Sequence, residues 1–221
     1  TIASTGNATD FGDMTVIRRG LTGAGNQTRG IFSGGRADPG ANPTDVIDYV
    51  TIAATGNAVD FGNLTAARRY LGSTANQTRS LSASGTTGSD TNIIDYVEIA
   101  TTGNAADFGD LVENRNSVEG NASATRGLFG AGSPGPTNQI AAVTIASLGS
   151  TFDFGDLTQA RMDPMSASSS IRGVWCGGAT PTKQDTIDYV TIATAGNGVD
   201  FGNLSAAASE GSGLSNGHGG L

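Results

Sequence analysis

The chain has 221 residues, a formal net charge of −8, 34 glycines and 37% hydrophobic residues. That length is enough for one domain with a sizeable core, and the composition is rich in turns without being collagen-like or disordered. The acidic balance disfavours nucleic acid and anionic lipid as partners, and no apolar run approaches the roughly 20 residues of a membrane-spanning helix. Cys176 is the only cysteine, so no disulfide forms within the chain, which fits a cytosolic or virion protein better than a disulfide-stapled secreted one.

A pattern that reads TIAATGNAVDFGNLT at residues 51–65 occurs five times along the chain. The copies are 50, 47, 46 and 47 residues apart, and their Asp-Phe-Gly triplets begin at Asp10, Asp60, Asp107, Asp153 and Asp200. A period near 47 residues is typical of one supersecondary unit repeated in a stack or a ring. We therefore expect residues 1–221 to form a single domain of repeated units.

Each repeat is predicted to contain four strands, here called A to D. In the best-defined copy they cover residues 29–35, 46–53, 61–68 and 71–76, with a loop at residues 36–45 between A and B. Strand A ends in glycine and other small residues, which favour close backbone approach, and so we expect strand A to be innermost. Strand B alternates apolar residues on both faces, which indicates a sheet covered on both sides.

Four-stranded units of this length that pack on both faces predict an all-β propeller. The chain opens in the register of strand B, and residues 217–221 stand in the register of strand A. We therefore predict five blades, with the ring closed by the C-terminal strand pairing with the N-terminal blade. The alternative is a chain cut from a longer propeller, in which Leu221 lies in mid-strand.

The glycine pair that ends strand A, the tyrosine in strand B and the arginine after strand C resemble kelch-type propeller repeats across nearly the whole chain. The chain departs from that pattern because its repeated aromatic residue is the phenylalanine of Asp-Phe-Gly, and a ring of five blades is more similar to tachylectin-like rings. The block IDYVTIA followed by GNAxDFG looks like repeats of predicted proteins of marine bacteriophages. This resemblance implies a virion or tail-associated role and a virion or extracellular location.

The repeated charged residues are predicted to build the blades. The aspartates of the five triplets are expected to cap turns. Asp-Phe-Gly is also a protein-kinase motif, but the other kinase motifs are absent from this sequence, so the triplet does not indicate a kinase. Asparagine and aspartate at positions such as Asn57, Asp60 and Asn63 also offer oxygen ligands for Ca²⁺. Turn capping explains these residues without a metal, and we therefore predict no metal site and no cofactor. Two series of arginines follow the first four aspartates, one eight residues later and one 19 residues later. Both are expected to pair with aspartate side chains or carbonyl groups between blades, with a ring that recognises an anionic glycan or a partner as the alternative. They are Arg18, Arg68, Arg115 and Arg161, and Arg29, Arg79, Arg126 and Arg172.

The sequence lacks residues that common enzyme mechanisms require. His218 is the only histidine and stands near the C-terminus, which argues against a Ser-His-Asp or Cys-His site and against a His-Cys zinc cluster. Only four glutamates fall outside the repeated aspartate pattern as candidates for glycosidase carboxylates. Trp175 and Cys176 are unique, and we expect both to lie in the core rather than to bind a sugar or to react. We therefore predict that the chain is not an enzyme.

The loops between strands A and B vary in length while the rest of the repeat is rigid, and recognition residues commonly lie on such loops. Unselected drift of surface loops explains the variation equally well. The candidate binding residues on these loops are Arg36, Asp38, Asn42, Asp90, Asn92, Asn138, Lys183 and Asp185. The first hypothesis is a structural or adhesion module of a virus particle that docks on a virion protein or a host surface. The alternative is a lectin-like module with several equivalent glycan sites.

Overall fold

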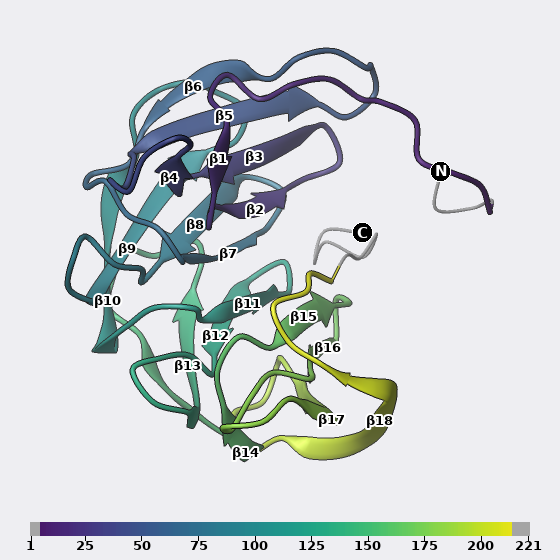
Figure 1. Ribbon diagram of the computed structural model, residues 1–221. Helices are drawn as coiled ribbons and strands as arrows, with labels where there is room; N and C mark the ends of the chain where they lie inside the picture. Colours follow the sequence, from purple (N-terminus) through teal and green to yellow (C-terminus); the bar gives the residue numbers. More distant parts are fainter. Residues whose placement is uncertain (1–4, 214–221) are drawn as a thin grey trace.

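The computed structural model describes residues 5–213, and all of the regular secondary structure in this range is β-strand. Four antiparallel sheets of four strands each follow one another along the chain (Figure 1). We call these sheets blades 1 to 4 and give the strands of each from the innermost outward. Blade 1 consists of β2 (Thr22–Gly25), β3 (Arg29–Ser33), β5 (Val46–Thr51) and β6 (Val59–Asn63), and blade 2 of β7 (Gly72–Ala75), β8 (Arg79–Ala83), β9 (Thr91–Glu98) and β10 (Ala106–Arg115). Blade 3 consists of β11 (Glu119–Ala122), β12 (Arg126–Gly130), β13 (Thr137–Thr144) and β14 (Phe152–Arg161), and blade 4 of β15 (Met165–Ser168), β16 (Arg172–Cys176), β17 (Gln184–Thr191) and β18 (Val199–Ala208). A separate two-stranded pair joins β1 (Arg18–Arg19) to β4 (Arg36–Ala37). No helix long and apolar enough to cross a membrane occurs within residues 5–213.

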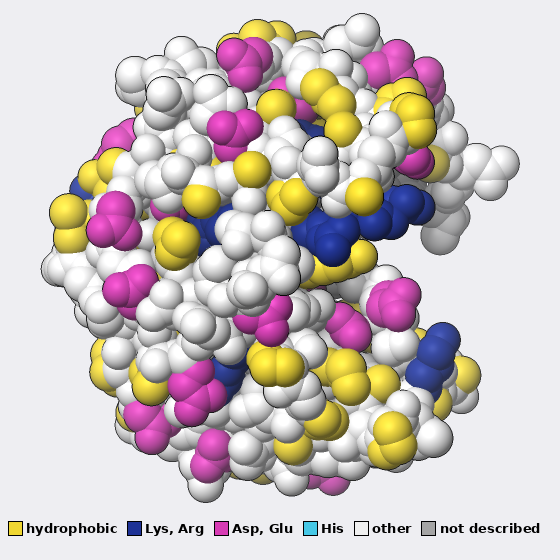
Figure 2. All heavy atoms as spheres, turned by 60° about the vertical axis from the view of Figure 1, so that its left-hand side comes forward, with side chains coloured by type: hydrophobic (Ala, Val, Ile, Leu, Met, Phe, Trp, Pro, Cys, Tyr) yellow, Lys and Arg dark blue, Asp and Glu magenta, His cyan; other side chains and the backbone are white. Residues whose placement is uncertain are grey.

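The sheets are arranged like the blades of a propeller, so the prediction of an all-β propeller is confirmed. The prediction of five blades is wrong for the described residues, which form four blades in an open ring. A wide gap separates blade 1 from blade 4 in the space-filling view (Figure 2). The strand that was predicted to close the ring lies in residues 214–221, outside the described residues.

The innermost strand of each blade is strand D of the preceding repeat, which corrects the prediction that strand A is innermost. The small residues that end strand A have a different role, which Gly34 and Gly35 illustrate. Both have positive φ angles, of 66° and 101°, and a Cβ on Gly34 would lie 2.6 Å from the carbonyl oxygen of Arg68. They therefore make the turn that lets the linker to the next blade pass close by.

Three apolar clusters fill the spaces between neighbouring blades. Between blades 1 and 2, Phe61 and Ile47 of blade 1 pack with Val97 and Ile99 of blade 2. Equivalent residues form the clusters between blades 2 and 3 and between blades 3 and 4. Blades 2 and 3 therefore bury one face against the preceding blade and the other against the following blade, whereas blades 1 and 4 each bury one face in this way.

Candidate functional site

A buried arginine–aspartate pair lies at the entry to three of the four blades. Arg68, in the linker from blade 1, donates from Nη2 to Asp95 of blade 2 over 2.6 Å, and both side chains are inaccessible to solvent. Its Nη1 group donates to the backbone carbonyl oxygens of Ser84 and Ile93 over 2.7 and 2.8 Å. Burial lowers the pKa of Arg68, and the charge of Asp95 opposes that shift. The arginine thus ties the incoming linker to strands A and B of the blade that follows.

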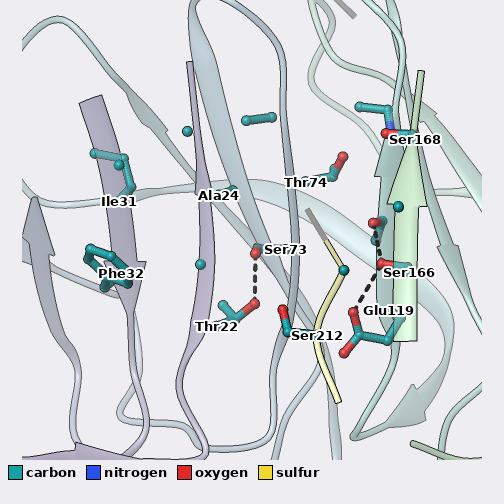
Figure 3. Close-up of a pocket in the computed structure, with 18 of the residues that line it drawn as sticks. Thr22, Ala24, Ile31, Phe32, Ser73, Thr74, Glu119, Ser166, Ser168 and Ser212 are labelled. Atoms are coloured by element: carbon teal, nitrogen blue, oxygen red, sulfur yellow. Dashed lines mark hydrogen bonds between the residues drawn. The ribbon is translucent and has the colours of Figure 1, made fainter. Parts of the chain in front are cut away.

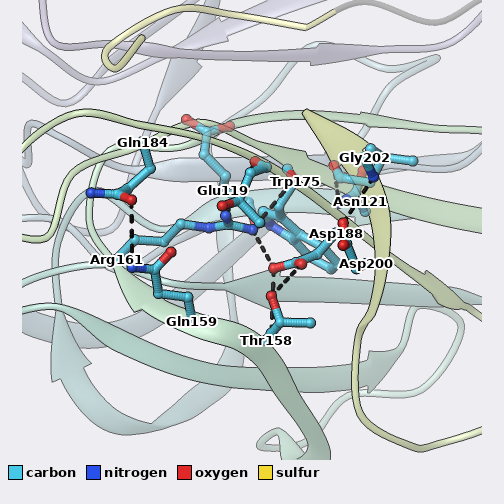
Figure 4. Close-up of polar contacts among 12 residues, drawn as sticks. Glu119, Asn121, Thr158, Gln159, Arg161, Trp175, Gln184, Asp188, Asp200 and Gly202 are labelled. Carbon is cyan, nitrogen blue, oxygen red and sulfur yellow. Dashed lines mark hydrogen bonds and ion pairs between the residues drawn. The ribbon is translucent and has the colours of Figure 1, made fainter. Parts of the chain in front are cut away.

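The same pair recurs as Arg18 with Asp48 in blade 1 and as Arg161 with Asp188 in blade 4. Figure 4 shows Arg161 pointing at Asp188, which also accepts a hydrogen bond from Thr158. In blade 3 the aspartate position holds Ala141, and Arg115 bonds instead to Gln139 and Glu113. Each buried pair therefore anchors a linker to the blade that it enters.

The second arginine series joins blades at the opposite end of strand A. Arg79 lies 4.8 Å from the ring centre of Tyr96 and donates to the carbonyl oxygen of Ile145 in blade 3 over 3.0 Å. Arg29 and Arg126 make the same bond to Ile99 and Ile192 of the following blades. Arg172 of blade 4 stacks over Tyr189 at 4.5 Å and has no such carbonyl partner within residues 5–213.

The Asp-Phe-Gly triplets of the four outer strands lie at bulges, and in blades 1 to 3 the phenylalanine is buried. The aspartate carboxylate accepts a hydrogen bond from the backbone N–H of the glycine at Asp10, Asp107, Asp153 and Asp200, with distances between 2.9 and 3.2 Å. Asp60 makes no such bond among the described residues. The repeated asparagines act between blades, since Oδ1 of Asn104 in blade 2 accepts from the backbone N–H of Asn63 in blade 1 over 3.1 Å. These side chains therefore serve the backbone, and no cluster of metal-ligating side chains occurs within the described range.

The four A–B loops emerge on one face of the ring, because all four blades share the same strand order and the same antiparallel pairing of strands A and B. Short bridges tie each loop to the linker that enters its blade, such as the bridge of Arg69 with Thr86 and that of Met162 with Ala179. We call this surface, made by residues 34–45, 84–90, 131–136 and 177–183, the loop face. Three of the candidate binding residues are bonded at or beside it: Asp90 accepts from Asn116, Asn92 donates to the Leu111 carbonyl and Asp185 accepts from Asn203.

The other five candidates make no side-chain hydrogen bond or ion pair among residues 5–213: Arg36, Asp38, Asn42, Asn138 and Lys183. Asp38, Asn42 and Lys183 are exposed, whereas Arg36 and Asn138 are partly buried. These five residues come from blades 1, 3 and 4. The structure therefore places donors, acceptors and both signs of charge on one face without bringing them into a single cluster.

One hollow was not predicted from the sequence. It is a cavity of about 620 Å³ on the axis of the ring, lined by the inner strands of all four blades and by residues 211–213 (Figure 3). Its walls carry hydroxyl groups from Thr22, Ser73, Ser166 and Ser168. The only sequence signal for the cavity is the run of small residues in each strand D.

Glu119 lines this cavity and accepts a hydrogen bond from the Ser166 hydroxyl over 3.1 Å. Burial raises the pKa of Glu119 to about 7, against a smaller lowering by the Ser166 bond. Its carboxyl group therefore exchanges a proton near neutral pH. In the sequence, Glu119 is one of the four glutamates that fall outside the repeated aspartate pattern.

Of the two unique residues of β16, Trp175 lies in the core as predicted, whereas Cys176 is only partly buried. Trp175 is fully buried, and its indole N–H donates to the carbonyl oxygen of Glu119 over 3.2 Å. Cys176 is partly buried, and burial raises the pKa of its thiol. A thiol with a raised pKa is less often in its nucleophilic form.

Neither the family models nor the curated proteins contain a match to this chain.

Proposed function

We propose that the chain is a non-enzymatic recognition module that docks on another protein through the loop face. The observation that carries the proposal is the contrast between scaffold and loops. The repeated arginines, aspartates and asparagines are engaged in bonds within and between blades, whereas Asp38, Asn42 and Lys183 stand exposed on loops of different length. A rigid scaffold with unlike loops suits recognition of one partner through unlike contacts.

The setting we propose for this module is a virus particle, in which the partner is a virion protein or a host-surface protein or glycan. Its support is the resemblance of the repeat block to predicted proteins of marine bacteriophages. The same resemblance supports a virion or extracellular location.

The experiment is a selection of protein fragments, displayed from a genomic library of the source, against the immobilised chain. Binding of enriched fragments is then measured with the triple variant Asp38→Ala, Asn42→Ala, Lys183→Ala. A control variant changes exposed residues on the opposite face, Thr55→Ala and Thr102→Ala. We expect binding that falls at least tenfold in the loop variant and stays unchanged in the control. Enriched fragments that bind both variants alike would contradict the loop face as the docking surface.

A lectin-like function is the second candidate, and the axial cavity is the observation that favours it. Hydroxyl groups and the carboxyl group of Glu119 around about 620 Å³ offer both donors and acceptors to a saccharide. The spaces between blades are filled by apolar clusters, which favours one central site over several equivalent sites. A glycan array followed by titration calorimetry tests this candidate. One sugar per chain, with binding lost in Glu119→Ala, supports it, and a blank array with and without Ca²⁺ refutes it.

A further inference from the structure

Three arginines gather where the A–B loop of blade 1 meets the linkers that enter and leave this blade. Arg19 of β1 and Arg36 of β4 stand directly opposite each other in their antiparallel pair, so their side chains leave the same side of that pair. Tyr70 N–H donates to the Gly20 carbonyl over 2.7 Å, which places the linker of Arg69 beside that of Arg19. Figure 2 shows dark-blue side chains gathered on blade 1 beside the gap. We call Arg19, Arg36 and Arg69 the arginine patch.

The arginine patch carries positive charge without a counter-charge in the described part of the chain. None of its members forms an ion pair there, although Asp38 follows Arg36 by two residues. Arg19 is exposed, and the Nε atoms of Arg36 and Arg69 are buried with no hydrogen-bond partner among residues 5–213. Arg69 donates from Nη1 to the Ala41 carbonyl of the same loop over 3.2 Å. Like charges directly opposite each other on paired strands are destabilising, so a bound anion would stabilise this arrangement.

The arginine patch is specific to the surroundings of blade 1 rather than part of the repeated architecture. At the positions equivalent to its two linker residues and its loop residue, the later parts of the chain hold uncharged residues. They are Asn116, Met162 and Ser209 after blades 2, 3 and 4, and Thr86, Ser133 and Ala179 in the loops. Asp163 and Glu210 take the position of Tyr70, since these three residues share left-handed φ angles of 51°, 61° and 58°. The linkers beside blade 1 are therefore basic, whereas the segments before and after blade 4 carry carboxylates.

Two exposed apolar side chains flank the arginine patch. The Tyr70 ring is 42% exposed, and its centre lies 5.4 Å from the guanidinium carbon of Arg69. Ile17 is 77% exposed, and its carbonyl oxygen accepts from the N–H of Asp38 in the loop over 2.9 Å. Arginine and tyrosine are among the residue types that most often dominate the binding energy of protein interfaces. The combination of cations with exposed apolar groups therefore fits a polypeptide better than a free inorganic anion.

We propose that the arginine patch binds an acidic segment of the partner protein, in which aspartate or glutamate residues alternate with apolar ones. The carboxylates of this segment pair with the guanidinium groups, which suit bidentate bonds to carboxylate, and its apolar residues pack on Tyr70 and Ile17. The chain as a whole carries a net charge of −8, so most of its surface repels an acidic segment and directs it to this patch. This binding mode rests on the proposed docking through the loop face and specifies which kind of partner docks there.

The test measures the binding of three fluorescent peptides by anisotropy: the acidic peptide GDLDGDLDG, its neutral counterpart GNLNGNLNG and its basic counterpart GKLKGKLKG. We expect the acidic peptide to bind the intact chain about tenfold more tightly than the neutral one, and to bind more weakly as salt is raised. Arg19→Gln is expected to weaken binding of the acidic peptide about threefold. Arg172→Gln is the matched control, because it alters an exposed arginine of blade 4 at the opposite end of strand A, and it leaves binding unchanged. In the double variant Arg19→Glu, Arg36→Glu we expect the basic peptide to bind more tightly than the acidic one.

Three results would overturn the proposal. Equal affinity of the intact chain for the acidic and neutral peptides, or absence of binding by both, refutes it directly. Equal losses in Arg19→Gln and Arg172→Gln show that the acidic peptide responds to net charge alone. Inorganic phosphate that binds as tightly as the acidic peptide and displaces it shows that the patch takes a small anion instead.

Failure of this proposal is distinguishable from failure of the docking proposal on which it rests. The variant Asp38→Ala, Asn42→Ala, Lys183→Ala keeps all three arginines of the patch. Library fragments that bind this variant and the unmodified chain alike refute docking through the loop face, whatever the peptides do. Library fragments that require the loop residues but bind Arg19→Gln and the double glutamate variant unchanged refute the arginine patch alone.

Discussion

The three filled spaces between blades and the one open gap are built from the same repeated residues. In the filled spaces the phenylalanine of Asp-Phe-Gly is buried and stacks edge-on against a tyrosine at 5.8 to 5.9 Å in blades 1 and 2. At the gap Phe201 keeps the same contact with Tyr189 at 5.8 Å but stays mostly exposed. The contacts within a blade therefore form whether or not another blade follows, whereas burial of the phenylalanine, which stabilises the ring, requires the following blade.

The largest predicted difference between the two regions comes from truncating this phenylalanine. We expect Phe108→Ala to lower the free energy of unfolding by about 3–5 kcal/mol, because it leaves a cavity between blades 2 and 3. Phe201→Ala, the matched change at the gap, is expected to cost less than about 1 kcal/mol because the side chain is largely exposed. Chemical denaturation of the two variants measures both values. Equal costs would mean that the gap is filled in solution.

Breaking a buried ion pair is expected to have a similar or slightly smaller effect. Asp95→Ala leaves Arg68 buried without its partner, and we expect a loss of about 3–4 kcal/mol. Glu98→Ala is the control, because the pair of Arg79 with Glu98 is partly exposed and is expected to contribute less than about 1 kcal/mol. A loss in Asp95→Ala no larger than in the control contradicts a structural role for the buried pairs.

The raised pKa of Glu119 predicts a dependence of stability on pH. The folded state holds the proton more tightly than the unfolded state, so this contribution is fully present below about pH 4.5 and is lost as pH rises through about 7. Partial solvent access limits its size to the order of 1–3 kcal/mol. We expect Glu119→Gln to remove this part of the pH dependence in thermal melts between pH 5 and pH 8. A variant with the pH profile of the unmodified chain would show that Glu119 titrates normally.

The smallest predicted effect concerns the turn-capping aspartates. Asp153→Ala removes a 3.1 Å hydrogen bond to Gly155 N–H and is expected to cost about 1 kcal/mol. Asp60→Ala is the control because Asp60 lacks this bond, and its expected cost is below about 0.5 kcal/mol. The same melts with a chelator test the calcium alternative: we expect unchanged melting temperatures, and a drop on chelation would show that these turns bind metal.

The sequence predicted the blades because the repeat is long and its apolar alternation is strong. It did not predict the order of strands within a blade, since small residues end strand A and also fill strand D, and only the packed structure shows that strand D is the one at the axis. It also did not predict the open gap, because Phe201 stands in the same motif as Phe154 and differs only in its surroundings. The sequence predicted that arginines pair with aspartates between blades. It did not predict that Arg68 pairs with Asp95, because these two residues lie 27 residues apart in the sequence.

Hydrogen–deuterium exchange read by mass spectrometry tests the central claim, which is that residues 5–213 leave the ring open between blades 4 and 1. We predict that peptides from β18 and from residues 5–14 exchange much faster than peptides from β10 and β14, their counterparts at filled spaces. Equal protection of all four regions would contradict the claim and show that the gap is covered in solution.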